Sequence, residues 1–154
     1  MAIMGGCSLL SDRGAPFLTV ENRDESEYRL AVSVVGVDDR GELSFRATTG
    51  SGDRTSVSAA DLREPGGFRN VTLDADGARS QEKTVPAARQ TGDARRTTFA
   101  INMWDPGEAT VYVVETGEDG SLVGIHVVTC GLRDQDHAMT IEDGRIVDRS
   151  ATCS

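Results

Sequence analysis

The sequence predicts an all-β protein, an antiparallel two-sheet sandwich of Greek-key type with about eight or nine strands. Two observations support this prediction. Apolar and polar residues alternate with a period of two in several short segments, and Gly, Pro and Asp clusters punctuate the chain between them. A small open β-barrel is the alternative, because it would show the same strand and turn signals.

The first strands are read from this alternation. Residues 17–21 form the expected opening strand, and 28–34 form the next, with Tyr, Leu and Val on one face and Arg, Ala and Ser on the other. A turn at 38–41 leads into a strand around 43–45, and a further strand is expected around 71–73.

One segment, 58–64, is expected to be helical over about two turns. Ser58 can cap its first turn, Asp61 lies where a carboxylate is favourable, and Pro65 ends it. No other segment has a convincing period of 3.6 residues.

The stretch 78–96 is polar and is expected to be a long surface connection, with at most an edge strand near Val85. It contains Arg89, Arg95 and Arg96, which could bind an anionic ligand or the carboxylates of a partner. Local ion pairing with Asp93 is the simpler interpretation.

The second half predicts a meander of antiparallel strands at 97–103, 111–114 and 122–129. The first turn of this meander, at 104–107, contains Pro and Gly, which supply turn dihedrals. A short hairpin follows, with strands at 137–141 and 145–148.

That hairpin bears on two cysteines. Cys130 and Cys153 bracket it, and because a hairpin brings its ends together, we expect a disulfide between them. By the chain-entropy model such a bridge stabilises by about 3 kcal/mol. The alternative is two buried or idle thiols.

The third cysteine, Cys7, follows Met4-Gly5-Gly6 near the N-terminus. This context is similar to the end of a lipoprotein signal, in which the cysteine becomes lipidated, but a charged start and an apolar run are missing before it. Either Met1 lies inside a longer gene product, or Cys7 is an ordinary thiol. Residues 1–15 are therefore expected to be a signal remnant or tether, and 16–154 a single β-sandwich domain.

The charge balance limits the classes of partner that the protein is expected to bind. There are 25 acidic and 16 basic residues, only one of which is a lysine, Lys83, and the net charge is -9. A nucleic-acid partner is not expected, because phosphate binding needs a clustered basic surface. Abundant acid with almost no lysine is typical of proteins from extreme halophiles, whose surfaces stay soluble in high salt.

In this setting the segment Phe17–Asn22 followed by Leu30–Val34 resembles small haloarchaeal lipoproteins and secreted immunoglobulin-like domains. The resemblance covers most of the chain in architecture and rests on generic β patterns. It implies an extracytoplasmic domain without established catalysis, attached to a membrane only through a lipid on Cys7.

A metal site is the main chemical alternative. His126, Cys130, His137 and Met139 have the ligand types of a blue-copper site, as found in cupredoxins. On one strand, however, residues four apart lie about 13 Å apart, so His126 and Cys130 could not share a metal unless the strand breaks. We therefore expect no cofactor.

The favoured function is a non-catalytic extracytoplasmic domain that binds a protein partner or an envelope component, with 78–96 as the contact surface. A small-ligand or metal carrier that uses His126, His137 and Met139 is the second hypothesis. A hydrolase ranks last, because no nucleophile or phosphate-binding motif is present.

Overall fold

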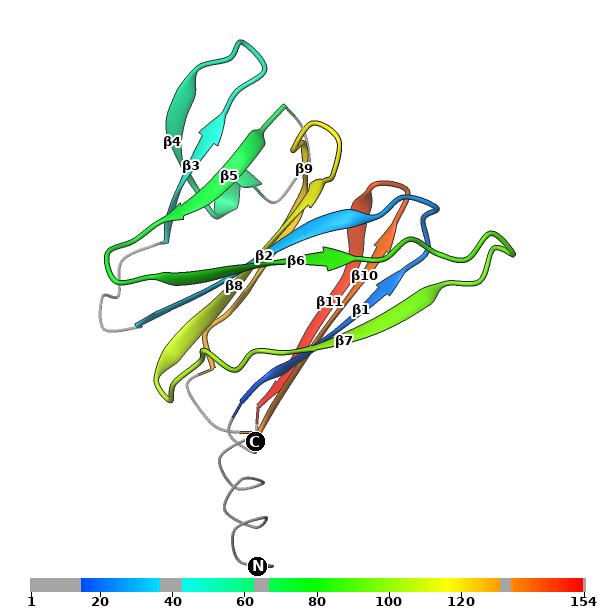
Figure 1. Cartoon of the computed structure of the whole chain (residues 1–154). Helices are drawn as coiled ribbons and strands as arrows, with labels where there is room; N and C mark the ends of the chain where they lie inside the picture. Colours follow the sequence, from blue (N-terminus) through cyan, green and yellow to red (C-terminus); the bar gives the residue numbers. More distant parts are fainter. Residues whose placement is uncertain (1–14, 37–42, 63–66, 131–133, 154) are drawn as a thin grey trace, which may run out of the picture.

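The computed structural model describes residues 15–36, 43–62, 67–130 and 134–153. They form eleven strands in three sheets, so the all-β prediction is confirmed (Figure 1). The strands are β1 (Phe17–Asn22), β2 (Tyr28–Gly36), β3 (Ser44–Thr48), β4 (Arg54–Ser58), β5 (Arg69–Asp74), β6 (Arg79–Val85), β7 (Arg95–Ala100), β8 (Glu108–Thr116), β9 (Leu122–Val128), β10 (Gln135–Glu142) and β11 (Arg145–Cys153).

Two four-stranded sheets form the sandwich. Sheet A has the order β11-β10-β1-β7, and sheet B has the order β6-β2-β8-β9. Alternate residues of their strands meet in one buried cluster, which includes Leu18, Val20, Leu30, Val32, Val34, Tyr112, Val114, Met139 and Ile141. The period-two alternation of the sequence therefore reports which face of each strand enters this core.

A third sheet, sheet C (β4-β3-β5), was not predicted. It covers the other face of β8 and β9 through a second core that contains Phe45, Leu62, Val111, Val113 and Ile125. Figure 1 shows this sheet beside β8 and β9, away from sheet A. Consequently β8 is buried on both faces, which explains its uninterrupted apolar run Val-Tyr-Val-Val.

Strand direction is one point where the prediction was wrong. β1 pairs with β10 in parallel, with Val20 opposite Met139, although an entirely antiparallel sandwich was expected. Periodicity gives the buried face of a strand but not its direction, and both directions would bury these two residues.

The predicted meander was also partly wrong. β8 and β9 form the expected antiparallel pair, but β7 pairs with β1 in sheet A. The turn between β7 and β8 bends the chain across from one sheet to the other. There Gly107 has a positive φ of 89°, and the Trp104 indole N–H donates to the Glu108 carbonyl at 2.8 Å.

The stretch 78–96 is not the long connection that was expected. Nearly half of it is strand, since β6 pairs with β2 from Val85 to Arg79 and β7 begins at Arg95, which leaves 86–94 as the connection. β6 lies at the edge of sheet B and is largely exposed. Its polar composition reflects that edge position.

The expected helix at 58–64 is a single 3₁₀ turn, Ala60–Leu62, and residues 63 and 64 lie outside the described part of the chain. The predicted cap exists, because the Ser58 hydroxyl accepts from the Asp61 backbone N–H at 3.3 Å, and the Asp61 carboxylate in return accepts from the Ser58 backbone N–H at 3.0 Å. One turn gains too few hydrogen bonds to propagate, and Ser58 itself belongs to β4. The described strands do not close into a barrel.

Candidate functional site

Two of the predicted metal ligands, His126 and His137, approach each other between the two sheets of the sandwich. His126 lies on β9 and His137 on β10, and their ring centroids are 6.5 Å apart. Tyr112 of β8 contacts both rings, at centroid distances of 5.8 and 5.6 Å. The fold thus gathers three rings from three strands.

His137 is the middle of a buried polar chain. Its Nδ1 lies 2.6 Å from the Tyr112 hydroxyl, and its Nε2 lies 2.8 Å from Oε1 of Gln135. The Gln135 amide N–H donates to the Cys130 carbonyl at 2.8 Å. Because Oε1 can only accept, Nε2 carries the proton and Nδ1 accepts from Tyr112.

Burial determines the protonation states of the His137 and Tyr112 side chains in this hydrogen-bonded chain. It lowers the pKa of His137 to about 4, and the nearby His126 adds to the effect while Asp136 opposes it. Burial also raises the pKa of the Tyr112 hydroxyl above its usual range. Near neutral pH the chain is therefore uncharged, with every hydrogen bond made.

These contacts bear on the metal hypothesis. Both ring nitrogens of His137 have protein partners, Met139 is in the sandwich core, and Cys130 is disulfide-bonded. Within the described residues, no three His, Cys, Asp or Glu side chains are grouped so as to hold a metal ion. A metal bound at these residues would have to displace the existing partners.

The disulfide joins Cys130 to Cys153, whose Cα atoms are 6.3 Å apart. The β10–β11 hairpin produces this approach, because Cys153 is paired with Gln135 at the open end of the hairpin. Gln135 in turn holds the Cys130 backbone. Cys7, the expected lipid anchor, lies outside the described residues.

The side of the sandwich formed by β9 and β11, here called the β9–β11 mouth, is closed by two reciprocal hydrogen bonds. The His126 ring Nε2 donates to the Ser150 carbonyl at 3.1 Å, and Arg149 Nε donates to the Ile125 carbonyl at 2.7 Å. Burial, with a smaller contribution from Arg149, lowers the pKa of His126. Beside these bonds lies a hollow of about 370 Å³.

The opposite side, formed by β6 and β7, is here called the β6–β7 mouth. Lys83 shares the inward face of sheet B with its register partner Leu30, and its ammonium lies 5.7 Å from the centroid of the Phe99 ring. A hollow of about 410 Å³ lies here, lined by Ser80, Gln81, Lys83, Ala100, Asn102 and Met103. An inward-pointing cation on an edge strand disfavours pairing with a further strand. Each mouth thus has one inward-pointing cation on an edge strand, Lys83 on β6 here and Arg149 on β11 at the β9–β11 mouth.

The three arginines predicted to interact are near the β6–β7 mouth but do not form one cluster. Arg96 pairs with Glu21 at 3.0 Å, so the expected pairing with Asp93 is wrong for this residue. Arg89 belongs to a tight turn in which its backbone N–H donates to the Asp93 carbonyl. Both Arg89 and Arg95 are exposed, and neither has an ion pair with another described residue.

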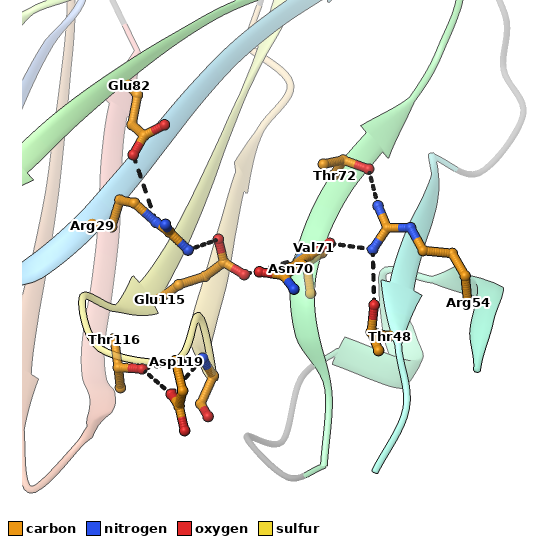
Figure 2. Close-up of polar contacts among 11 residues, drawn as sticks. Arg29, Thr48, Arg54, Asn70, Val71, Thr72, Glu82, Glu115, Thr116 and Asp119 are labelled. Atoms are coloured by element: carbon orange, nitrogen blue, oxygen red, sulfur yellow. Dashed lines mark hydrogen bonds and ion pairs between the residues drawn. The ribbon is translucent and has the colours of Figure 1, made fainter. Parts of the chain in front are cut away.

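A buried carboxylate that the sequence did not single out joins sheet C to sheet B (Figure 2). Glu115 Oε2 accepts from the Val71 backbone N–H at 2.9 Å, and Oε1 lies 3.5 Å from Arg29, which also reaches Glu82. Burial raises the pKa of Glu115 despite these donors. A Glu directly after the apolar run of β8, opposite Arg29 of β2, was the available signal.

Sheet C is attached next to this carboxylate by backbone bonds as well. The Asn70 N–H donates to the Gly120 carbonyl at 3.1 Å, and the Leu122 N–H donates to the Phe68 carbonyl at 2.9 Å. Gly120 has a positive φ of 72°, and a Cβ there would lie 2.5 Å from the Asn70 side chain. Glu115 and Gly120 together hold β5 against the β8–β9 hairpin.

In the described part of the chain no helix is long and apolar enough to cross a membrane. Comparison with protein families gives a match over residues 1–154 to the family described as "Halobacterial Ig domain protein". Among solved structures, one named "Trapped Toxin" is 11% identical, with a TM-score of 0.34. The alignment covers 91% of this chain and 23% of that one, so this chain spans about a quarter of its length. No curated protein matches the sequence.

Proposed function

Because the chain belongs to the family of halobacterial Ig domain proteins, we propose that it is a non-catalytic, extracytoplasmic domain that binds a protein or envelope partner. The observation that carries the proposal is the β6–β7 mouth. Among the described residues each of these strands lies at the edge of its sheet, and β6 and the start of β7 are largely exposed, so a partner can contact their side chains. The inward-pointing Lys83 disfavours addition of a further strand, so the contact is made by side chains.

The charges near this mouth support it as the contact surface. Lys83, Arg89 and Arg95 lie in or beside the 86–94 connection, and none has an ion pair with another described residue. In a chain with a net charge of -9 this is a local excess of positive charge. An acidic partner would be attracted to it, and charge complementarity of this kind raises association rates and specificity.

The histidines support a role without catalysis. His137 uses both ring nitrogens in the buried chain, and His126 donates to a backbone carbonyl. A general base must reach the proton it removes, and the ring of His137 is engaged on both sides. The Tyr112–His137–Gln135 chain therefore acts in packing.

Site-specific photo-crosslinking in haloarchaeal cells tests the contact surface. A benzophenone amino acid at Gln90, in the 86–94 connection, should give one discrete adduct, and the double variant Arg89→Glu/Arg95→Glu should weaken it. The matched control places the same group at Glu118, an exposed residue in the β8–β9 turn. An identical adduct from Glu118, or none from Gln90, would contradict the proposal.

The compartment has a separate test. We propose that a lipid on Cys7 holds the domain at the outer face of the membrane, by the two-chain anchoring that makes such attachment stable. Wild-type protein should fractionate with membranes, and Cys7→Ser should be released in soluble form outside the cell. Wild-type protein found inside the cell with Cys130 and Cys153 reduced would disprove an extracytoplasmic location.

A further inference from the structure

The β9–β11 mouth contains a hollow that the proposed function does not use. It has a volume of about 370 Å³ and is lined by Ala59, Ile125, His126, Val127 and Arg149. Ala59 directly follows β4, the next three residues belong to β9 and Arg149 belongs to β11, so the hollow lies where all three sheets approach one another. Its size is at the lower end of the range for small-molecule sites.

Arg149 supplies the charge of this hollow. Arg149 pairs with no carboxylate in the described part of the chain, a property that it shares with Arg89 and Arg95, but of these three it is the one that lines the hollow. Its Nε is bound to the Ile125 carbonyl at 2.7 Å. The remaining donors of the guanidinium are the two Nη groups, whose end-on fork matches the two oxygens of a carboxylate.

The position of Arg149 is built into the fold. A Cβ on Gly124 would lie 3.2 Å from Arg149 Nη2, so the glycine makes room for the guanidinium beside β9. His126 holds the facing strand by donating to the Ser150 carbonyl, next in sequence to Arg149. The cation is therefore held in place before any ligand arrives, which reduces the entropy lost on binding.

The apolar walls of the hollow indicate what the ligand carries besides its negative charge. Ala59, Ile125 and Val127 are apolar, and all three belong to or pack against the core beneath sheet C. A bare inorganic ion would leave these walls uncovered. A ligand that combines a carboxylate with a short apolar group would pair with Arg149 and cover them.

We propose that the β9–β11 mouth is a binding site for a carboxylate attached to a small apolar group, with Arg149 as the anchoring cation and Ala59, Ile125 and Val127 as the apolar wall. Two sources share this chemistry: a free small carboxylic acid, and the C-terminal residue of a polypeptide. The site is distinct from the β6–β7 mouth, so it can fail without affecting the proposed contact surface.

The test is an NMR titration of the full chain at constant ionic strength with two pairs of probes. One pair is benzoate and benzamide, and the other is acetyl-Ala-Val and its C-terminal amide. We expect each acid to shift the amide signals of residues 124–127 and the Arg149 Nε–H signal in a saturable way. Each neutral amide should bind at least tenfold more weakly. The acid that binds more tightly identifies the source.

Three variants locate the effect. Arg149→Gln should weaken binding of the acids at least tenfold, and Ala59→Leu, which fills the hollow while leaving Arg149 in place, should do the same. Lys83→Gln, at the other mouth, should change nothing. Equal shifts with the neutral amides or with chloride alone, or unchanged binding in both Arg149→Gln and Ala59→Leu, would overturn the proposal.

Discussion

At the scale of single residues, close packing between strands explains two residues, His137 and Gly124, whose structural roles the sequence did not indicate. His137 is neutral because its two nitrogens face one hydroxyl donor and one amide acceptor. Gly124 has no side chain because Ile146 of β11 occupies the space above it. Both features depend on strands that are distant in sequence.

His137 should make stability depend on pH. Its pKa falls from 6.5 to about 4 on folding, so the unfolded state binds more protons between these values. Its contribution is fully present above pH 6.5 and is lost as pH falls toward 4, a change of about 3 kcal/mol at roughly 1.4 kcal/mol per pKa unit. Urea unfolding at several pH values should show this slope in wild type and a smaller one in His137→Gln.

Tyr112→Phe is the control for that experiment. It retains the imidazole but removes the hydroxyl that donates to Nδ1, so stability should fall by about 1–3 kcal/mol at neutral pH while the pH dependence persists. If His137→Gln and wild type show the same slope from pH 4 to 6.5, the buried neutral imidazole is not the cause.

Gly124→Ala should destabilise the protein by about 1–3 kcal/mol, because overpacking at a close contact is costly. The added Cβ would lie 2.8 Å from Ile146 Cδ1. In an Ile146→Val background, which removes that methyl group, the same change should cost less. Gly50→Ala is the matched control, since a Cβ at Gly50 meets no atom within 4 Å. Equal effects at both glycines, measured by thermal unfolding, would rule out the packing explanation.

At the scale of elements, the β10–β11 hairpin shows how local signals lead to a correct pairing. Its turn residues and alternating strands are contiguous, so the sequence indicates the register without knowledge of the rest of the chain. The structure extends the strands to Gln135–Glu142 and Arg145–Cys153. This length brings Cys153 to the level of Cys130.

Loss of the disulfide should destabilise β11 more than the buried strands. Replacing both bridged cysteines by alanine should lower the free energy of unfolding by about 3 kcal/mol in the chain-entropy model. Hydrogen exchange should accelerate in β11, whose C-terminal end is otherwise exposed, more than in the buried strand β8. Alkylation without reductant should leave Cys130 and Cys153 unlabelled and should label Cys7 only in protein that lacks the lipid, such as protein made without the lipidation machinery. Labelling of all three cysteines would show that the bridge is absent in solution.

At the scale of the whole molecule, two apolar cores join the three layers, and a few polar contacts add to the junction between sheets B and C. Sheets A and B share a continuous apolar core, whereas sheet C joins sheet B through the second core and the Glu115 contacts (Figure 2). Burial of one carboxylate there is tolerated because backbone N–H groups and Arg29 face it.

Glu115→Gln should loosen sheet C selectively. The amide presents an N–H₂ group toward Val71 N–H or Arg29, so one buried donor loses its acceptor, at a cost of about 1–3 kcal/mol. Hydrogen exchange should rise in β3, β4 and β5, and much less in sheet A. Glu82→Gln, which alters the other and more exposed partner of Arg29, should have a small effect. Uniform acceleration across all three sheets would contradict a local attachment by Glu115.

The sequence by itself determined most of the strands and their buried faces, the β8–β9 and β10–β11 hairpins, and the proximity of Cys130 to Cys153, because these follow from periodicity and turn chemistry over a few residues. It missed β4 and most of β6, whose residues are largely polar. Only the tertiary structure decided that β1 runs parallel to β10, that sheet C covers β8 and β9, and that His126, His137 and Tyr112 meet. The unbroken apolar run of β8 was the one local sign of a third layer. The remaining features depend on pairings between distant segments, which local alternation does not encode.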